Sequence, residues 1–162
     1  MKTLRLFSLA LSFVALALTG CKDECKDVVC QNGGTCDEGT CLCATGYEGT
    51  NCETEVRAKF VGSYSVQESC QSGNYTFSMS VTSSSTGVSN IIINNFYDIG
   101  ISVSASITGN SVTIPNQTTI NDQGIAFTVS GNGQLIGNIL TLTYNISAGA
   151  ESDSCTATCT KQ

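Results

Sequence analysis

The chain has 162 residues, with 13 acidic and seven basic side chains, ten cysteines and no histidine, and its net charge at pH 7 is −6. This acidic balance argues against nucleic acid and anionic lipid as partners. The absence of histidine excludes Ser-His and Cys-His nucleophile pairs and removes the commonest metal ligand.

Residues 1–20 have the form of an export signal. Lys2 and Arg5 precede an apolar run from Leu6 to Leu18, which is interrupted only by two serines. A permanent membrane helix needs roughly 20 apolar residues, so this run is too short to stay in a bilayer. The pattern therefore predicts a secretory signal that is removed from the mature protein.

The apolar run ends in Leu18, Thr19, Gly20 and Cys21. These four residues resemble the bacterial lipobox, which implies cleavage before Cys21 and acylation of that cysteine, with palmitate as one of the acyl groups. Several acyl chains on one residue make a stable membrane anchor. The alternative is ordinary cleavage nearby, which would leave Cys21 as a thiol or disulfide partner.

Lys22, Asp23 and Glu24 follow Cys21 directly. They resemble the export tag of Bacteroidota lipoproteins, a lysine followed by two acidic residues beside the lipidated cysteine. The resemblance implies an outer-membrane lipoprotein exposed on the cell surface. The alternative is a solvated, charged linker.

Six cysteines fall within residues 25–52, a segment with few large apolar side chains. Such a short segment cannot bury enough surface to fold alone, so cross-links must supply its stability. Cysteine-rich exported chains form disulfides. The cysteine count alone leaves the pairing open.

The run from Cys30 to Cys36, followed by Cys41 to Cys52 with its Gly46-Tyr47 pair, resembles an EGF-like domain. The resemblance implies a module over residues 25–52 that either mediates contacts or acts as a stiff spacer, and its place between the membrane and the main domain favours the spacer. Calcium-binding members of that family carry an acidic or amide residue four positions before the first cysteine, where this chain has Cys21, so we expect no bound metal. The implied disulfides are Cys25–Cys36, Cys30–Cys41 and Cys43–Cys52.

Residues 58–162, after a linker at residues 53–57, alternate between apolar and polar side chains with period two. Turn signals at residues 72–74, 108–110, 121–124, 131–133 and 137–138 divide this region into seven or eight short antiparallel strands. We expect an antiparallel up-and-down β-barrel, with a β-sandwich as the alternative. The opening segment, Lys59 to Tyr64, resembles the first strand of lipocalin-like (calycin) barrels.

The remaining cysteines bear on barrel closure. Cys70 ends the first strand on its apolar phase, while Cys155 and Cys159 share one face of the last strand. If these two strands pair side by side, Cys70 meets Cys155, and we predict that disulfide. Cys159 is then a buried thiol, unless it replaces Cys155 as the partner or forms an intermolecular bridge.

The function suggested by these features is binding of a small apolar molecule, a glycan or a protein through the β domain, without catalysis. Phe96 and Tyr97, at a predicted strand end, are candidate contacts for a small apolar molecule or glycan, with ordinary packing as the alternative. Passive display or adhesion is the second hypothesis. The acidic residues of the β domain look scattered, and no serine lies in a nucleophile elbow, so we expect no enzyme and no cofactor, with a carboxylate-based hydrolase as the remaining alternative. The expected partners are the membrane and an extracellular or periplasmic ligand.

Overall fold

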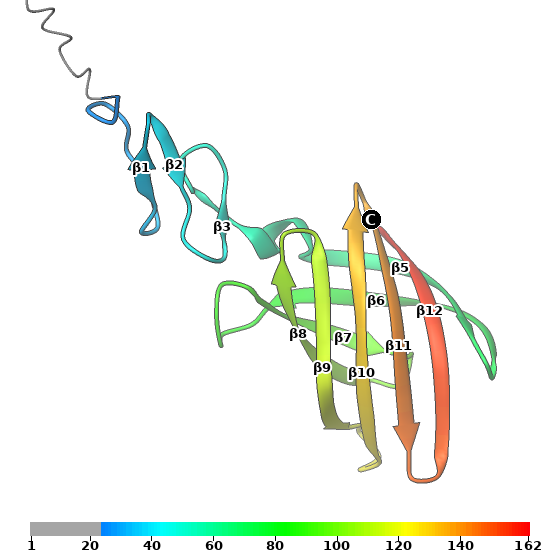
Figure 1. The fold of residues 1–162 in the computed structure, drawn as a ribbon. Helices are drawn as coiled ribbons and strands as arrows, with labels where there is room; N and C mark the ends of the chain where they lie inside the picture. The colour runs from blue at the N-terminus through cyan, green and yellow to red at the C-terminus, as the bar shows by residue number, and fades with distance from the viewer. Residues whose placement is uncertain (1–23) are drawn as a thin grey trace, which may run out of the picture.

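The structure is a computed structural model, and it describes residues 24–162. Lys22, Asp23 and the predicted signal and anchor lie outside the described residues. A small disulfide-rich module comes first, and a β-barrel follows it (Figure 1). No helix in the described part is long and apolar enough to span a membrane.

The disulfide-rich module consists of two short hairpins. β1 (Thr35–Asp37) pairs with β2 (Thr40–Leu42), and β3 (Tyr47–Glu48) pairs with β4 (Thr54–Glu55). Three disulfides hold these hairpins together, and they join the same cysteines that the EGF-like resemblance implies: Cys25–Cys36, Cys30–Cys41 and Cys43–Cys52.

The segment expected as a linker, residues 53–57, is structured. It contains β4 and the start of the 3₁₀ helix η1 (Val56–Lys59). Arg57 Nη1 in η1 donates to the backbone carbonyls of Ser84 and Gly87, at 2.6 and 2.8 Å. The segment thus joins the module to a loop of the barrel.

Eight antiparallel strands form a closed barrel, which confirms the predicted up-and-down barrel over the sandwich. Consecutive strands pair with each other, and β12 pairs with β5 to close the barrel. Their bounds are β5 (Gly62–Cys70), β6 (Gly73–Ser83), β7 (Asn90–Phe96), β8 (Ile101–Thr108), β9 (Ser111–Ile120), β10 (Ala126–Ile136), β11 (Ile139–Ala148) and β12 (Glu151–Lys161).

Period-two alternation builds the barrel wall. Strand β8 buries every second residue, beginning with Ile101, and exposes Ser102, Ser104 and Ser106. A strand with one apolar face gains free energy when that face turns inward. The buried residues of all eight strands form one continuous core that fills the barrel interior.

The barrel has two different ends. At the end nearest the module, which we name the plugged end, Phe60 follows η1 and is fully buried, and its carbonyl accepts a 2.7 Å hydrogen bond from the Tyr64 hydroxyl. Lys161 Nζ donates to the Lys59 carbonyl there at 2.8 Å. The opposite end, which we name the open end, carries the β5–β6, β7–β8, β9–β10 and β11–β12 connections.

The prediction of a turn at residues 131–133 is wrong, because these residues lie inside β10. Gly131 follows a register shift in the pairing with β9. A Cβ atom at Gly131 would lie 2.5 Å from the Tyr144 Cβ and 2.6 Å from the Thr143 carbonyl oxygen. A Cβ atom at Gly133 would likewise lie 2.4 Å from the Thr141 carbonyl oxygen, so Gly131 and Gly133 both allow β11 to approach closely.

Replacing Gly131 tests this close approach. We expect Gly131→Ala to lower the free energy of unfolding by about 1 to 3 kcal/mol, because the added methyl group overlaps atoms of β11 that cannot move freely. Asn132→Ala, at an exposed neighbouring position, should change it by less than about 0.5 kcal/mol. Chemical denaturation of both variants measures the difference, and equal stabilities would contradict the packing argument.

Candidate functional site

A pocket of about 440 Å³ lies at the open end of the barrel. Phe127 and Ile146 supply apolar surface, Tyr97 supplies an aromatic ring, and Glu151 and Asp153 supply acidic groups. The pocket residues come from β10, β11, β12, the β5–β6 turn and the β7–β8 loop, and they are Gln71, Ser72, Tyr97, Phe127, Ile146, Ser147, Ala148, Glu151, Ser152 and Asp153.

Asp153 holds three of these elements together. Its Oδ1 accepts hydrogen bonds from the backbone N–H groups of Gln71, Ser72 and Ser154 at 3.0, 3.4 and 2.9 Å. Its Oδ2 accepts from the Tyr97 hydroxyl at 2.8 Å and from the Ser72 hydroxyl. These donors, the Ser72 hydroxyl foremost, lower the pKa of Asp153, because they favour the ionised carboxylate.

Glu68 is a carboxyl group inside an otherwise apolar barrel, with 4% of its surface exposed. The Tyr144 hydroxyl donates to its Oε1. Burial raises the pKa of Glu68, and the nearby charges of Asp153 and Asp98 add to that rise, while the hydrogen bond from Tyr144 opposes it. No donor among the described residues reaches the other oxygen, Oε2.

Three tyrosines, which we name the tyrosine cluster, gather beside Glu68. Tyr75 lies opposite Glu68 in the β5–β6 pairing. The centroid of the Tyr97 ring lies 6.4 Å from that of Tyr75 and 6.4 Å from that of Tyr144, and it meets the Tyr144 ring edge-on at 87°. The cluster thus joins the pocket, which Tyr97 lines, to the buried carboxyl that Tyr144 contacts.

The β7–β8 loop that carries Tyr97 has an unusual backbone. Tyr97 and Asp98 in the loop have positive φ, at 57° and 55°, and so does Asn95 near the end of β7, at 55°. Side chains other than glycine adopt this conformation at a cost, and such positions concentrate at functional sites. The Asn95 amide supports the loop, because its Nδ2 donates to the Ser78 carbonyl at 2.8 Å and its Oδ1 accepts from Gly100 N at 3.2 Å.

The two ligand contacts predicted from the sequence, Phe96 and Tyr97, lie in different environments. Tyr97 lines the pocket. Phe96 is 2% exposed and packs against Tyr144 with ring centroids 4.4 Å apart, which is the packing role weighed as its alternative. Glu24, the described residue of the expected export tag, is exposed at the start of the module.

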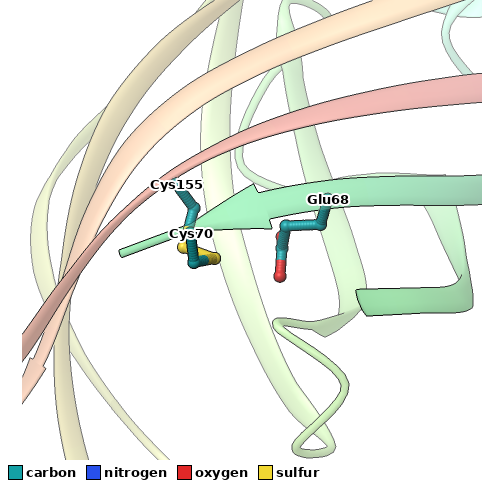
Figure 2. A group of neighbouring side chains, drawn as sticks. All are labelled: Glu68, Cys70 and Cys155. Carbon is teal, nitrogen blue, oxygen red and sulfur yellow. A yellow bond between two sulfur atoms is a disulfide. The ribbon is translucent and has the colours of Figure 1, made fainter. Parts of the chain in front are cut away.

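A second group of possible ligands lies next to Glu68. Figure 2 shows Glu68 beside Cys70 and Cys155, and the ligand atoms of these three residues lie within 4.8 Å of one another. The two sulfurs form the predicted disulfide Cys70–Cys155, so neither is a thiolate that binds metal. Among residues 24–162, no other group of three acidic or sulfur-bearing side chains is close enough to hold a metal.

Cys159 is the free cysteine among the described residues, and it is buried in the barrel. It faces Val66 across the β12–β5 pairing, four residues along the strand from Cys155. At about 3.3 Å per residue, that offset is too long for a disulfide between Cys159 and Cys70. Burial raises the pKa of the Cys159 thiol to about 12, so the thiol is protonated and unreactive at neutral pH.

The acidic residues of the barrel are not scattered, contrary to the sequence interpretation. All of them lie at the open end, on or beside its four connections, while the barrel's lysines, Lys59 and Lys161, lie at the plugged end. Alternate turns of an up-and-down barrel share an end, so counting turns would have revealed this segregation from the sequence. These acidic residues are Glu68, Asp98, Asp122, Glu151 and Asp153.

No protein-family model matches the chain, and no solved structure matches it.

Replacing Asp153 tests its structural role. We expect Asp153→Asn to lower the thermal unfolding midpoint at pH 7, because the amide nitrogen cannot accept the hydrogen bonds that the lost carboxylate oxygen accepts. The folded-state pKa of Asp153 is lowered, so this stabilisation is present above the ordinary pKa of aspartate and is lost as the pH falls through the folded-state value. The difference in unfolding midpoint between Asp153→Asn and the wild type should therefore become smaller in acid.

Asp122→Asn is the matched control, since Asp122 is exposed at the same end of the barrel. Its midpoint should stay close to that of the wild type at every pH. A deficit of Asp153→Asn that persists undiminished in acid would contradict the linkage argument.

Proposed function

We propose that this protein is a lipid-anchored outer-membrane protein of the cell surface, and that its barrel binds a small molecule rather than catalysing a reaction. The lipobox-like residues up to Cys21 and the charged residues Lys22, Asp23 and Glu24 support the anchor and its location. The three disulfides of the module support an EGF-like spacer, because they pair as that family's do.

The observation that carries the binding proposal is the pocket at the open end. Its lining residues lie on or beside the connections at the open end, which is the end of the barrel opposite the disulfide-rich module; Figure 1 shows the module and the barrel strands. Its volume of about 440 Å³ falls within the usual range for small-molecule sites. A spacer that holds the other end toward the membrane would leave this end facing outward.

The barrel interior itself favours a shallow site over a deep one. Core side chains from all eight strands fill it, so a ligand would bind between the connections of the open end and not along the barrel axis. The same packed interior is the observation that favours the second candidate, a passive display or adhesion module. The apolar and aromatic lining from Phe127, Ile146 and Tyr97 favours binding over display.

The environment of the carboxylates supports a non-enzymatic role. Glu68 and Asp153 have pKa values shifted in opposite directions, as the acid and base of a glycosidase do. However, the two oxygens of Asp153 already accept five hydrogen bonds from the protein, which leaves no lone pair for a water molecule or substrate. Glu68 is not among the residues that line the pocket.

Filling the pocket tests the binding proposal. Ala148 lies on the inward phase of β11 and lines the pocket, so Ala148→Trp should occupy the space that a ligand needs. We expect the full chain in a non-ionic detergent to enhance the fluorescence of the neutral probe N-phenyl-1-naphthylamine, and the variant to lose most of that enhancement.

Thr143→Trp is the matched control, because Thr143 lies on the outward face of the same strand. It should bind the probe as the wild type does, and unfolding midpoints should show that both variants fold. Equal enhancement by Ala148→Trp and wild type would refute binding in this pocket and favour the display module.

Protease accessibility on intact cells tests the proposed location. We expect added protease to digest the wild-type barrel, because a surface lipoprotein faces the medium, and to spare a variant with Lys22, Asp23 and Glu24 replaced by alanine. Cys21→Ala controls for the anchor and should release the protein from the membrane fraction. Protection of the wild type would overturn the surface location and indicate a periplasmic ligand.

A further inference from the structure

We propose that the ligand of the open-end pocket is an organic cation, an amine or quaternary ammonium group on a compact apolar body. This inference rests on the proposed binding function. The juxtaposition that carries it is an apolar pocket walled by the Tyr97 ring and the exposed carboxylate of Glu151, at the end of the barrel where all its acidic residues gather.

The distribution of charge selects the sign of the ligand. All five acidic residues of the barrel lie at the open end, and no lysine or arginine of residues 24–162 lies there. Glu151 is exposed on the pocket wall and makes no ion pair among the described residues. Charges of one sign around a cleft attract ligands of the opposite sign and repel those of the same sign.

The aromatic rings favour a cation of organic type. The hydroxyls of Tyr97 and Tyr144 both donate to carboxylates, Asp153 and Glu68. Donation to a negative group leaves each ring richer in electrons, and the face of an electron-rich ring attracts a cation. Tyr97 is the ring of the tyrosine cluster that lines the pocket, and Tyr75 and Tyr144 pack around it with ring centroids 6.4 Å away.

Glu68 places a further carboxyl group behind the pocket, next to the Tyr144 ring that Tyr97 contacts. It is 96% removed from solvent, yet Oε2 has no hydrogen-bond donor among the described residues. No fully buried polar atom of the described side chains lacks a partner, so this oxygen borders space that solvent can enter. Water that enters this space can satisfy Oε2, so the carboxyl adds to the acidic character of the open end without itself contacting a ligand in the pocket.

The same geometry disfavours a metal ion as the cation. Among the described residues, the two possible metal ligands close to Glu68 are Cys70 and Cys155. Their sulfurs are bonded to each other in a disulfide and do not bind a metal ion. The carboxylates of Asp98, Asp122, Glu151 and Asp153 form no group of three within the distance that one ion requires. Separated carboxylates and aromatic faces suit a larger cation whose charge is spread over methyl groups.

Three probes of nearly equal size and shape separate charge from shape. These probes are choline, the neutral 3,3-dimethyl-1-butanol and the anionic 3,3-dimethylbutyrate, titrated into the full chain in dodecyl maltoside and followed by ligand-observed NMR. We expect choline to bind about tenfold more tightly than the neutral alcohol, with the anion weakest.

Variants locate the effect in the site. Tyr97→Leu should remove most of the preference for choline over the alcohol, while Tyr97→Phe, which keeps a ring but loses the hydroxyl that donates to Asp153, should retain part of it. Glu151→Gln should reduce the preference, and Asp37→Asn, which removes an exposed acidic group from the module, should leave it unchanged. The preference is the ratio of the affinities for choline and for the alcohol. A variant that weakens the binding of both probes equally leaves this ratio unchanged, so general damage to the site does not look like a loss of preference.

The outcomes separate this inference from the proposed function. Binding of the alcohol or of N-phenyl-1-naphthylamine without a preference for choline would overturn the cation inference and leave the binding function standing. Absence of binding by every probe would overturn both. A choline preference that survives Tyr97→Leu and Glu151→Gln would also overturn the inference, because the effect would then lie elsewhere.

Discussion

The pairing of β5 with β12 is the constraint on which the rest of the structure depends. It joins strands from the two ends of the domain, and the Cys70–Cys155 disulfide fixes it across 85 residues. By loop entropy, a cross-link of this span stabilises the fold by on the order of 4 kcal/mol. Closure also removes the free strand edges along which sheets aggregate. Without it, the inward faces of the strands would have no common interior to fill.

Closure makes the two ends of the barrel chemically different. The plugged end is sealed by Phe60, and Arg57 and Lys161 donate there to backbone carbonyls. Ion pairs of Arg57 with Glu55 and of Lys59 with Glu48 add to this attachment. At the open end, Asp153 binds Ser72 and Tyr97 instead, so side-chain hydrogen bonds hold the connections in place. One end is therefore built for attachment to the module, and the other keeps polar and aromatic groups near solvent.

Much of the fold could be predicted from the sequence, because period-two alternation and the register of Cys70 and Cys155 carry local information about it. The pattern failed at residues 131–133, where glycines signal close approach of β11 and not a turn. The site was harder to predict. Tyr97 stood out as an aromatic residue near a strand end, but its partner Asp153 is distant in sequence, and only the folded chain brings them together.

Glu68 was available to sequence reasoning and was missed. It lies two residues after Val66 and two before Cys70, on the phase that faces the core, where a carboxyl group is out of place. Natural sequences break a local rule mainly where function or strain requires it. The barrel breaks two such rules within reach of the Tyr97 ring, since Glu68 is a buried acid and the β7–β8 loop holds two non-glycine residues, Tyr97 and Asp98, at positive φ. Both departures occur at the open end of the barrel. Neither of them stabilises the fold, so we attribute them to the function of that end.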